Sequence, residues 1–204
     1  MNNDCLVIVD IQPEYQRDFD LMIYDMVAKI NETNKPIICF YVGSELSLDD
    51  KYSVIGLFLE NGVDENKVNE MQFIEKDFGF FRCWMDLGVK EDIILNTLRV
   101  MYENGINDSR NLSDENWDEI LSTEDRKTFF LYDEPLIIPD FDKRLLNYFD
   151  NFELIGGGRW ECLEEINLYL KSINKNTVVN EDFCYEKQKN INDKIKKTNK
   201  KFTI

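Results

Sequence analysis

The sequence predicts an α/β fold of three layers, α/β/α, in which helices cover both faces of a mainly parallel, open sheet. Residues 5–12 and 36–43 are continuous apolar runs, which is typical of central strands that are buried on both faces. Residues 19–33 lie between them and carry apolar side chains at helical spacing, so the three segments form a βαβ unit. A second unit follows near the end of the chain, with strands at 152–158 and 176–183 around a helix at 159–173.

The middle of the chain predicts shorter elements. We expect a short helix near 54–59, a third strand at 68–76, an amphipathic helix at 89–104 and another helix from 113 to about 121. Further on, the sequence predicts a strand with a proline break at 128–138 and a short helix at 142–150.

Composition bounds the chemistry. The chain has 204 residues, a length that suits one domain, and it contains no histidine. The lack of histidine excludes Ser-His-Asp triads, Cys-His pairs and HExxH zinc sites, so acid–base chemistry falls to carboxylates, Lys, Tyr or Cys. Forty acidic residues against 24 basic ones give a net charge of −16. This balance argues against nucleic-acid binding, because phosphate contacts need clustered Lys and Arg.

The charge is unevenly distributed along the chain. Residues 187–204 hold seven Lys and one Asp, a net charge of +6, so residues 1–186 carry −22. We expect 1–186 to form a single domain and 187–204 to be a solvated basic tail, with a nucleic-acid or partner contact as the alternative for the tail.

The five cysteines form no CxxC pair, and the sequence has neither a signal peptide nor an apolar run of transmembrane length. This pattern predicts a cytoplasmic protein in a reducing compartment, with no membrane partner.

The strongest local feature is GGGRWEC at 156–162, where a strand ends, glycines form a tight turn and a helix begins. Backbone N–H groups at such a turn can bind an anion or an oxyanion. Cys162 falls in the first helical turn, where the helix dipole lowers the pKa of a thiol, whereas the neighbouring glutamates oppose that effect. Cys162 is therefore either a nucleophile or a small buried side chain on a helix face.

These motifs resemble the isochorismatase-like superfamily of cysteine hydrolases, which includes the nicotinamidases. VIVDIQPEY resembles that family's first strand, whose Asp is a catalytic acid and base and maps to Asp10. LIGGGRWECLEEINLYL resembles the turn and helix that present the nucleophile, which maps to Cys162. The resemblance also implies a cis peptide between Gly157 and Gly158, and an oxyanion held by the N–H groups of Gly158 and Cys162.

The family also uses a lysine after its third strand, with an aromatic residue five positions later. FIEKDFGFF places Lys76 and Phe81 at these positions, while the rival strand at 128–138 has no lysine where one would be needed. The resemblance therefore implies the catalytic residues Asp10, Lys76 and Cys162. A solvated lysine at the end of a strand is the alternative for Lys76.

This sequence departs from the family pattern. Lys76 and Cys162 are 86 residues apart, which is longer than usual in the family, so residues of about 84–128 are expected to form a helical insertion. Arg159 and Trp160 replace the family's Thr and Asp beside the nucleophile. The nicotinamidase metal site includes histidines, so we expect neither a metal nor another cofactor. Several stretches also resemble uncharacterised proteins of phages and large viruses, a resemblance that carries no established activity.

The resemblance implies a cysteine-dependent hydrolase that cleaves a small amide, or a related C–N bond, in a small-molecule substrate. The candidates for binding that substrate are Tyr15, Phe81, Trp84, Arg159 and Trp160, and core packing is the alternative role of the aromatic residues among them. The alternative function is a catalytically degenerate scaffold of this family that serves as a binding protein. Members of the superfamily often assemble, so a homo-oligomer is also compatible with the resemblance.

Overall fold

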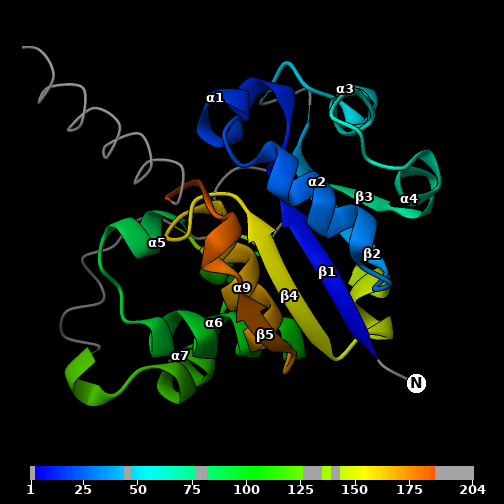
Figure 1. Ribbon diagram of the computed structural model, residues 1–204. Coiled ribbons are helices and arrows are strands. Elements are labelled where there is room, and N and C mark those ends of the chain that lie inside the picture. The colour runs from blue at the N-terminus through cyan, green and yellow to red at the C-terminus, as the bar shows by residue number, and fades with distance from the viewer. Residues whose placement is uncertain (1–2, 44–46, 77–81, 126–134, 139–142, 187–204) are drawn as a thin grey trace, which may run out of the picture.

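The computed structural model describes residues 3–43, 47–76, 82–125, 135–138 and 143–186. Within these residues, five parallel strands form one sheet in the order β3-β2-β1-β4-β5 (Figure 1). The strands are β1 (Asp4–Val9), β2 (Ile37–Val42), β3 (Gln72–Lys76), β4 (Asn151–Gly156) and β5 (Asn176–Val179). The chain runs outward from β1 to β3 and then returns to β4, so the strand order reverses between β1 and β4. Such a reversal is the place where open α/β sheets bind ligands.

The side chains of β1 divide the core into two layers. Cys5, Val7 and Val9 belong to one buried cluster, and Leu6 and Ile8 belong to the cluster on the opposite face. A strand that is buried on both faces needs apolar residues at every position, which explains the continuous apolar run in the sequence. The strand ends at Val9, earlier than predicted, because the chain turns at the next residue.

Helices cover both faces of the sheet, so the three-layer α/β/α arrangement is present (Figure 1). One face carries α1 (Gln16–Phe19), α2 (Ile23–Glu32), α3 (Lys51–Glu60) and α4 (Glu65–Glu70). The other face carries α5 (Arg82–Asp86), α6 (Glu91–Glu103), α7 (Asp114–Ile120) and α9 (Cys162–Ser172). Four 3-10 turns in the described residues are η1 (Pro13–Tyr15), η2 (Ser109–Asn111), η3 (Lys143–Tyr148) and η4 (Glu181–Phe183).

The predicted elements of the first half are present, with shifted ends. The helix predicted at 19–33 is present as α2, which begins only at Ile23, because a turn separates it from the shorter α1. The strand predicted at 68–76 begins only at Gln72. The residues before it form α4, whose start is capped by the Asp64 side chain.

The second half shows similar shifts. The helix predicted at 159–173 begins only at Cys162, because the residues before it form the turn out of β4. The strand predicted at 176–183 ends at Val179, ahead of η4. Most of the strand predicted at 128–138, and the whole of the basic tail 187–204, lie outside the described residues.

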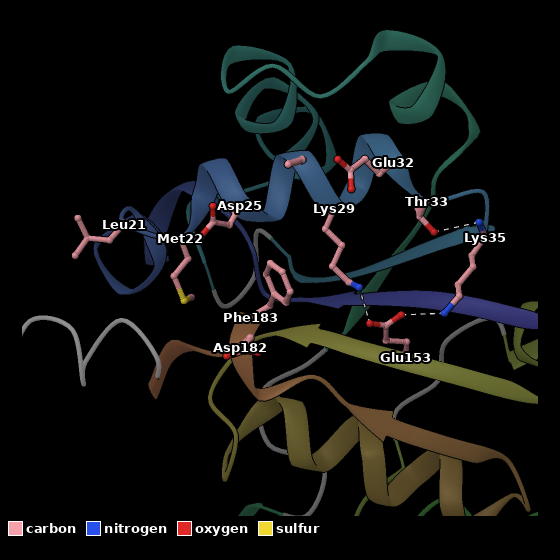
Figure 2. A pocket seen from close by; sticks show the side chains of 11 residues that line it. Leu21, Met22, Asp25, Lys29, Glu32, Thr33, Lys35, Glu153, Asp182 and Phe183 are labelled. Atoms are coloured by element: carbon pink, nitrogen blue, oxygen red, sulfur yellow. Dashed lines mark hydrogen bonds and ion pairs between the residues drawn. The ribbon is translucent and has the colours of Figure 1, made fainter.

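A cluster of charged and polar groups around Glu153 of β4 ties separate parts of the fold together (Figure 2). The Glu153 carboxylate pairs with Lys29 of α2 at 2.6 Å and with Lys35 ahead of β2 at 2.9 Å. Asn180, just after β5, donates to the same carboxylate at 3.0 Å. Burial raises the pKa of Glu153, but these donors outweigh that effect and lower it to about 2. Glu153 and both lysines line an open hollow of about 800 Å³ beside α2, which Phe183 also lines.

Glu153→Gln should destabilise the protein at neutral pH. The pKa of Glu153 falls from its ordinary 4.5 to about 2 on folding, so its stabilising effect is present above pH 4.5 and is lost as the pH falls through about 2. Because solvent reaches part of this cluster, we expect a loss of about 1–2 kcal/mol at pH 7. Urea unfolding of both proteins across this pH range measures the loss, and a difference that does not shrink with falling pH would contradict the assignment.

Candidate active site

A buried ion pair joins the carboxyl ends of two strands of the sheet. Asp10 directly follows β1 and Lys76 is the last residue of β3, with β2 between these strands. Lys76 Nζ lies 3.0 Å from Asp10 Oδ2, and the two side chains are 1% and 2% exposed. Removal of either partner would leave an uncompensated charge in the interior. Two residues that the sequence nominates from separate motifs are therefore one interacting pair.

The backbone turns sharply at Asp10, the first residue after β1. Asp10 has a φ of 53°, a left-handed conformation that costs a residue with a Cβ about 1–2 kcal/mol. Its N–H donates to the Phe40 carbonyl at 2.9 Å, and its own carbonyl accepts a hydrogen bond from the Tyr185 hydroxyl. Gly156 of β4 packs tightly beside this turn, since a Cβ there would lie only 2.3 Å from the Val9 carbonyl oxygen. The close approach of β1 and β4 at this edge therefore requires glycine.

The glycine-rich turn after β4 presents Cys162 at the first position of α9. Gly157 has a φ of 47°, and a Cβ on it would lie 2.9 Å from Cys162 Sγ, so the turn needs glycine to make room for the sulfur. The Gly158 N–H donates toward Cys162 Sγ, with the nitrogen 3.4 Å from the sulfur. The expected cis peptide between Gly157 and Gly158 is not found in this part of the chain. Positive φ angles at Gly156 and Gly157 form the turn instead.

Cys162 rests as a thiol. Burial raises the pKa of its side chain and the Asp10 carboxylate raises it further, while Lys76 and the Gly158 N–H lower it by less. The sequence left the balance between the helix dipole and the neighbouring acids open; the net effect is a raised pKa, because burial beside the Asp10 carboxylate dominates. Asp10 Oδ1 is buried and has no N–H or O–H donor among the described residues. The Cys162 thiol, which interacts with this carboxylate, is thus placed to give it a proton.

Lys76 is a permanent positive charge in this cluster. Burial lowers the pKa of its ammonium group, but Asp10, Cys162 and Glu165 together raise it above the ordinary 10.5. Glu165 lies in the first turn of α9 and is almost fully buried. Its influence on Lys76 places a second carboxylate near the site, where the sequence suggested only an unfavourable neighbour for a thiolate.

The candidate substrate-binding residues fall in different places. Tyr15 lies beside the cluster, since burial raises the pKa of its phenol and the charges of Asp10, Glu14 and Cys162 raise it further. Trp84 is almost fully buried and belongs to the core cluster that α6 and α9 share. Phe81 lies outside the described residues.

Arg159 and Trp160 line a different hollow, of about 690 Å³, together with residues of β5 and η4. The Arg159 guanidinium lies 4.4 Å from the centre of the Trp160 ring. It also pairs with the carboxylates of Glu164 and Glu181. Arg159 is thus engaged in ion pairs, although the sequence nominated it for substrate binding.

Sequence reasoning missed Tyr185. This residue follows η4, and its N–H donates to the Gly157 carbonyl at 2.9 Å while its hydroxyl donates to the Asp10 carbonyl. The available signal was its position just beyond the last predicted strand, because the carboxyl ends of parallel strands meet at one edge of the sheet.

Comparisons with protein-family models, with curated proteins and with solved structures find no match. The resemblance to the isochorismatase-like superfamily therefore stays a prediction that rests on the residues themselves. Within the described residues, no group of three or more His, Cys, Asp or Glu side chains is placed to hold a metal ion. The same residues contain no helix with the length and apolar character that a membrane crossing requires.

Asp10→Asn should make Cys162 react faster with iodoacetamide. The negative charge of Asp10 raises the pKa of the thiol, so its removal beside Lys76 increases the thiolate fraction. We expect the rate at pH 8 to rise several-fold over wild type, measured by mass spectrometry of the peptide that contains Cys162. Asp25→Asn, which removes an exposed carboxylate on α2, is the matched control and should leave the rate unchanged.

The buried thiols of Cys5 and Cys39 report loss of structure in the same experiment, because they react only if the core opens. Identical rates at Cys162 in wild type and Asp10→Asn would contradict the placement of the carboxylate beside the sulfur.

Proposed function

We propose that this protein is a cysteine-dependent hydrolase of the isochorismatase-like kind, acting on a small amide or a related C–N bond. The observation that carries the proposal is the convergence of Cys162, Asp10 and Lys76 from three separate segments, where a half-buried sulfur lies beside a buried ion pair. A nucleophile beside a base, with a third group that holds the base, is the arrangement that covalent hydrolysis needs. The location at the reversal of strand order in a parallel sheet supports the same assignment.

The first half of the reaction forms a thioester. As Cys162 Sγ bonds to the carbonyl carbon, the thiol proton passes to the Asp10 carboxylate and the carbonyl electron pair moves onto oxygen. We assign the oxyanion to two N–H groups: that of Gly158, which is directed toward Cys162 Sγ, and that of Cys162, which as the first residue of α9 has no intrahelical acceptor. Asp10 then returns the proton to the departing nitrogen as the C–N bond breaks.

The second half of the reaction consumes water. Asp10 takes a proton from water as the hydroxyl adds to the thioester carbon. It delivers that proton to the sulfur as the C–S bond breaks, and the carboxylic acid leaves. Lys76 stays charged throughout and offsets the negative charge that moves between Cys162 and Asp10. In this scheme a thiol resting state is productive, because Asp10 accepts the thiol proton as the sulfur attacks the substrate carbonyl.

A catalytically degenerate scaffold that binds a ligand or partner is the second candidate. The raised pKa of the Cys162 thiol favours it, as does the engagement of Arg159 with Glu164 and Glu181. A binding protein needs neither an activated sulfur nor an arginine that is free to hold a substrate anion.

Release of ammonia from simple primary amides and ureido compounds tests the hydrolase directly. We expect wild-type protein to release ammonia from at least one of them, followed with a coupled dehydrogenase, and to carry a thioester on Cys162 after an acid quench, seen by intact mass. Cys162→Ala should abolish both signals, because the bond-forming sulfur is gone. Cys83→Ala, which removes a half-buried thiol elsewhere, should retain both.

Two outcomes would contradict the hydrolase. One is ammonia release by Cys162→Ala at the wild-type rate. The other is no release by wild type from any compound, although one of them raises the melting temperature, which would favour the binding scaffold.

A further inference from the structure

Tyr185 makes a hydrogen bond to each of the two turns that carry the cluster. Its hydroxyl donates to the carbonyl of Asp10, just after β1, and its N–H donates to the carbonyl of Gly157, just before α9, at 2.9 Å. Its ring stacks on that of Phe19, with 6.2 Å between the ring centres and 26° between the planes. Phe19 is itself fully buried, so the tyrosine ring has a fixed support.

The bond to Asp10 completes the control of that residue's backbone. The peptide plane before the Asp10 Cα is held by the hydrogen bond from its N–H to the Phe40 carbonyl. The plane after the Cα is held by the hydrogen bond from Tyr185 to the Asp10 carbonyl. Because each peptide unit is planar, two fixed planes determine φ and ψ and therefore the direction of the Cα–Cβ bond. A residue with a Cβ keeps a φ of 53° only where its surroundings enforce it.

The direction of that bond decides where the carboxylate lies. Asp10 Oδ2 is 3.0 Å from Lys76 Nζ, and the same carboxylate interacts with the Cys162 thiol. Without the hydrogen bond that holds the second plane, the backbone of Asp10 is free to relax toward negative φ, which would carry its carboxylate away from both groups.

The charges around the phenol keep it a hydrogen-bond donor. Burial raises the pKa of Tyr185, and the nearby Asp10, Cys162 and Asp18 raise it further. The neutral phenol therefore persists across the pH range in which a hydrolase of this kind would act.

We propose that Tyr185 is a positioning residue of the Cys162 site. It keeps the Asp10 carboxylate beside the Cys162 thiol, and it links the glycine-rich turn before α9 to the end of β1. Its place in catalysis rests on the proposed function. The statement that Tyr185 sets the interaction between Asp10 and Cys162 needs no substrate to be tested.

The test compares iodoacetamide alkylation of Cys162 across pH in four proteins: wild type, Tyr185→Phe, Asp10→Asn and the double variant. Tyr185→Phe keeps the ring and the backbone N–H but removes the hydroxyl. We expect it to react several-fold faster than wild type at pH 8, because a displaced carboxylate no longer raises the pKa of the thiol. The double variant should react like Asp10→Asn, since the hydroxyl acts only through that carboxylate. Tyr24→Phe, on an exposed tyrosine, should match wild type.

A wild-type rate in Tyr185→Phe would overturn the proposal, as would additive effects in the double variant. Faster reaction of Cys5 and Cys39 as well as Cys162 would also overturn it, because it would mean that Tyr185 only holds the fold together. Failure of the proposed function is seen separately, as an absence of ammonia release by wild type while the alkylation pattern is retained.

Discussion

Asp10 and Lys76 lie at the ends of β1 and β3, on either side of β2, and their ion pair is shielded from water almost completely. Removing each charge from water costs several kcal/mol, and a 3.0 Å contact offsets that cost only in part. An apolar pair of similar volume would serve stability at least as well. The pair is therefore an exception to the apolar packing of the rest of the core. It lies at the carboxyl edge of the sheet, which is where open α/β folds bind their ligands. Buried charged groups that do not improve the stability of a fold are typical of functional sites.

The pair also acts on the protonation of the Cys162 sulfur. Lys76 and Asp10 act on the Cys162 thiol in opposite directions, so burial, the largest effect, decides that the proton stays on. A thiol in this state is protected from the oxidation and alkylation to which thiolates are prone. The strongly acidic body of the chain, with −22 over residues 1–186, matters less than composition suggests, because the Asp10–Lys76 pair is buried and the site carries its own lysine.

The sequence predicted those features that depend on local pattern. Strands β1 and β2 were evident because burial on both faces requires a continuous apolar run, and Asp10 and Cys162 were placed at one edge because parallel strands end together. Features that depend on tertiary contact were not predictable. A lysine at the end of a strand is usually solvated, and Lys76 is buried only because β3 pairs beside β2 and brings it over Asp10. The helix dipole at Cys162 is a local effect, whereas the burial that outweighs it comes from distant segments. Tyr185 carries no motif, and only the folded chain brings it to Asp10 and Gly157.

The most direct test of this account is the S–H stretching band of Cys162, obtained as the infrared difference between wild type and Cys162→Ser at neutral pH. The account predicts an S–H band that is shifted to lower frequency by interaction with the Asp10 carboxylate, and that moves toward the frequency of an unbonded thiol, or is lost to thiolate, in Asp10→Asn. The absence of an S–H band for Cys162 in the wild-type protein, or a band that does not respond to Asp10→Asn, would contradict it.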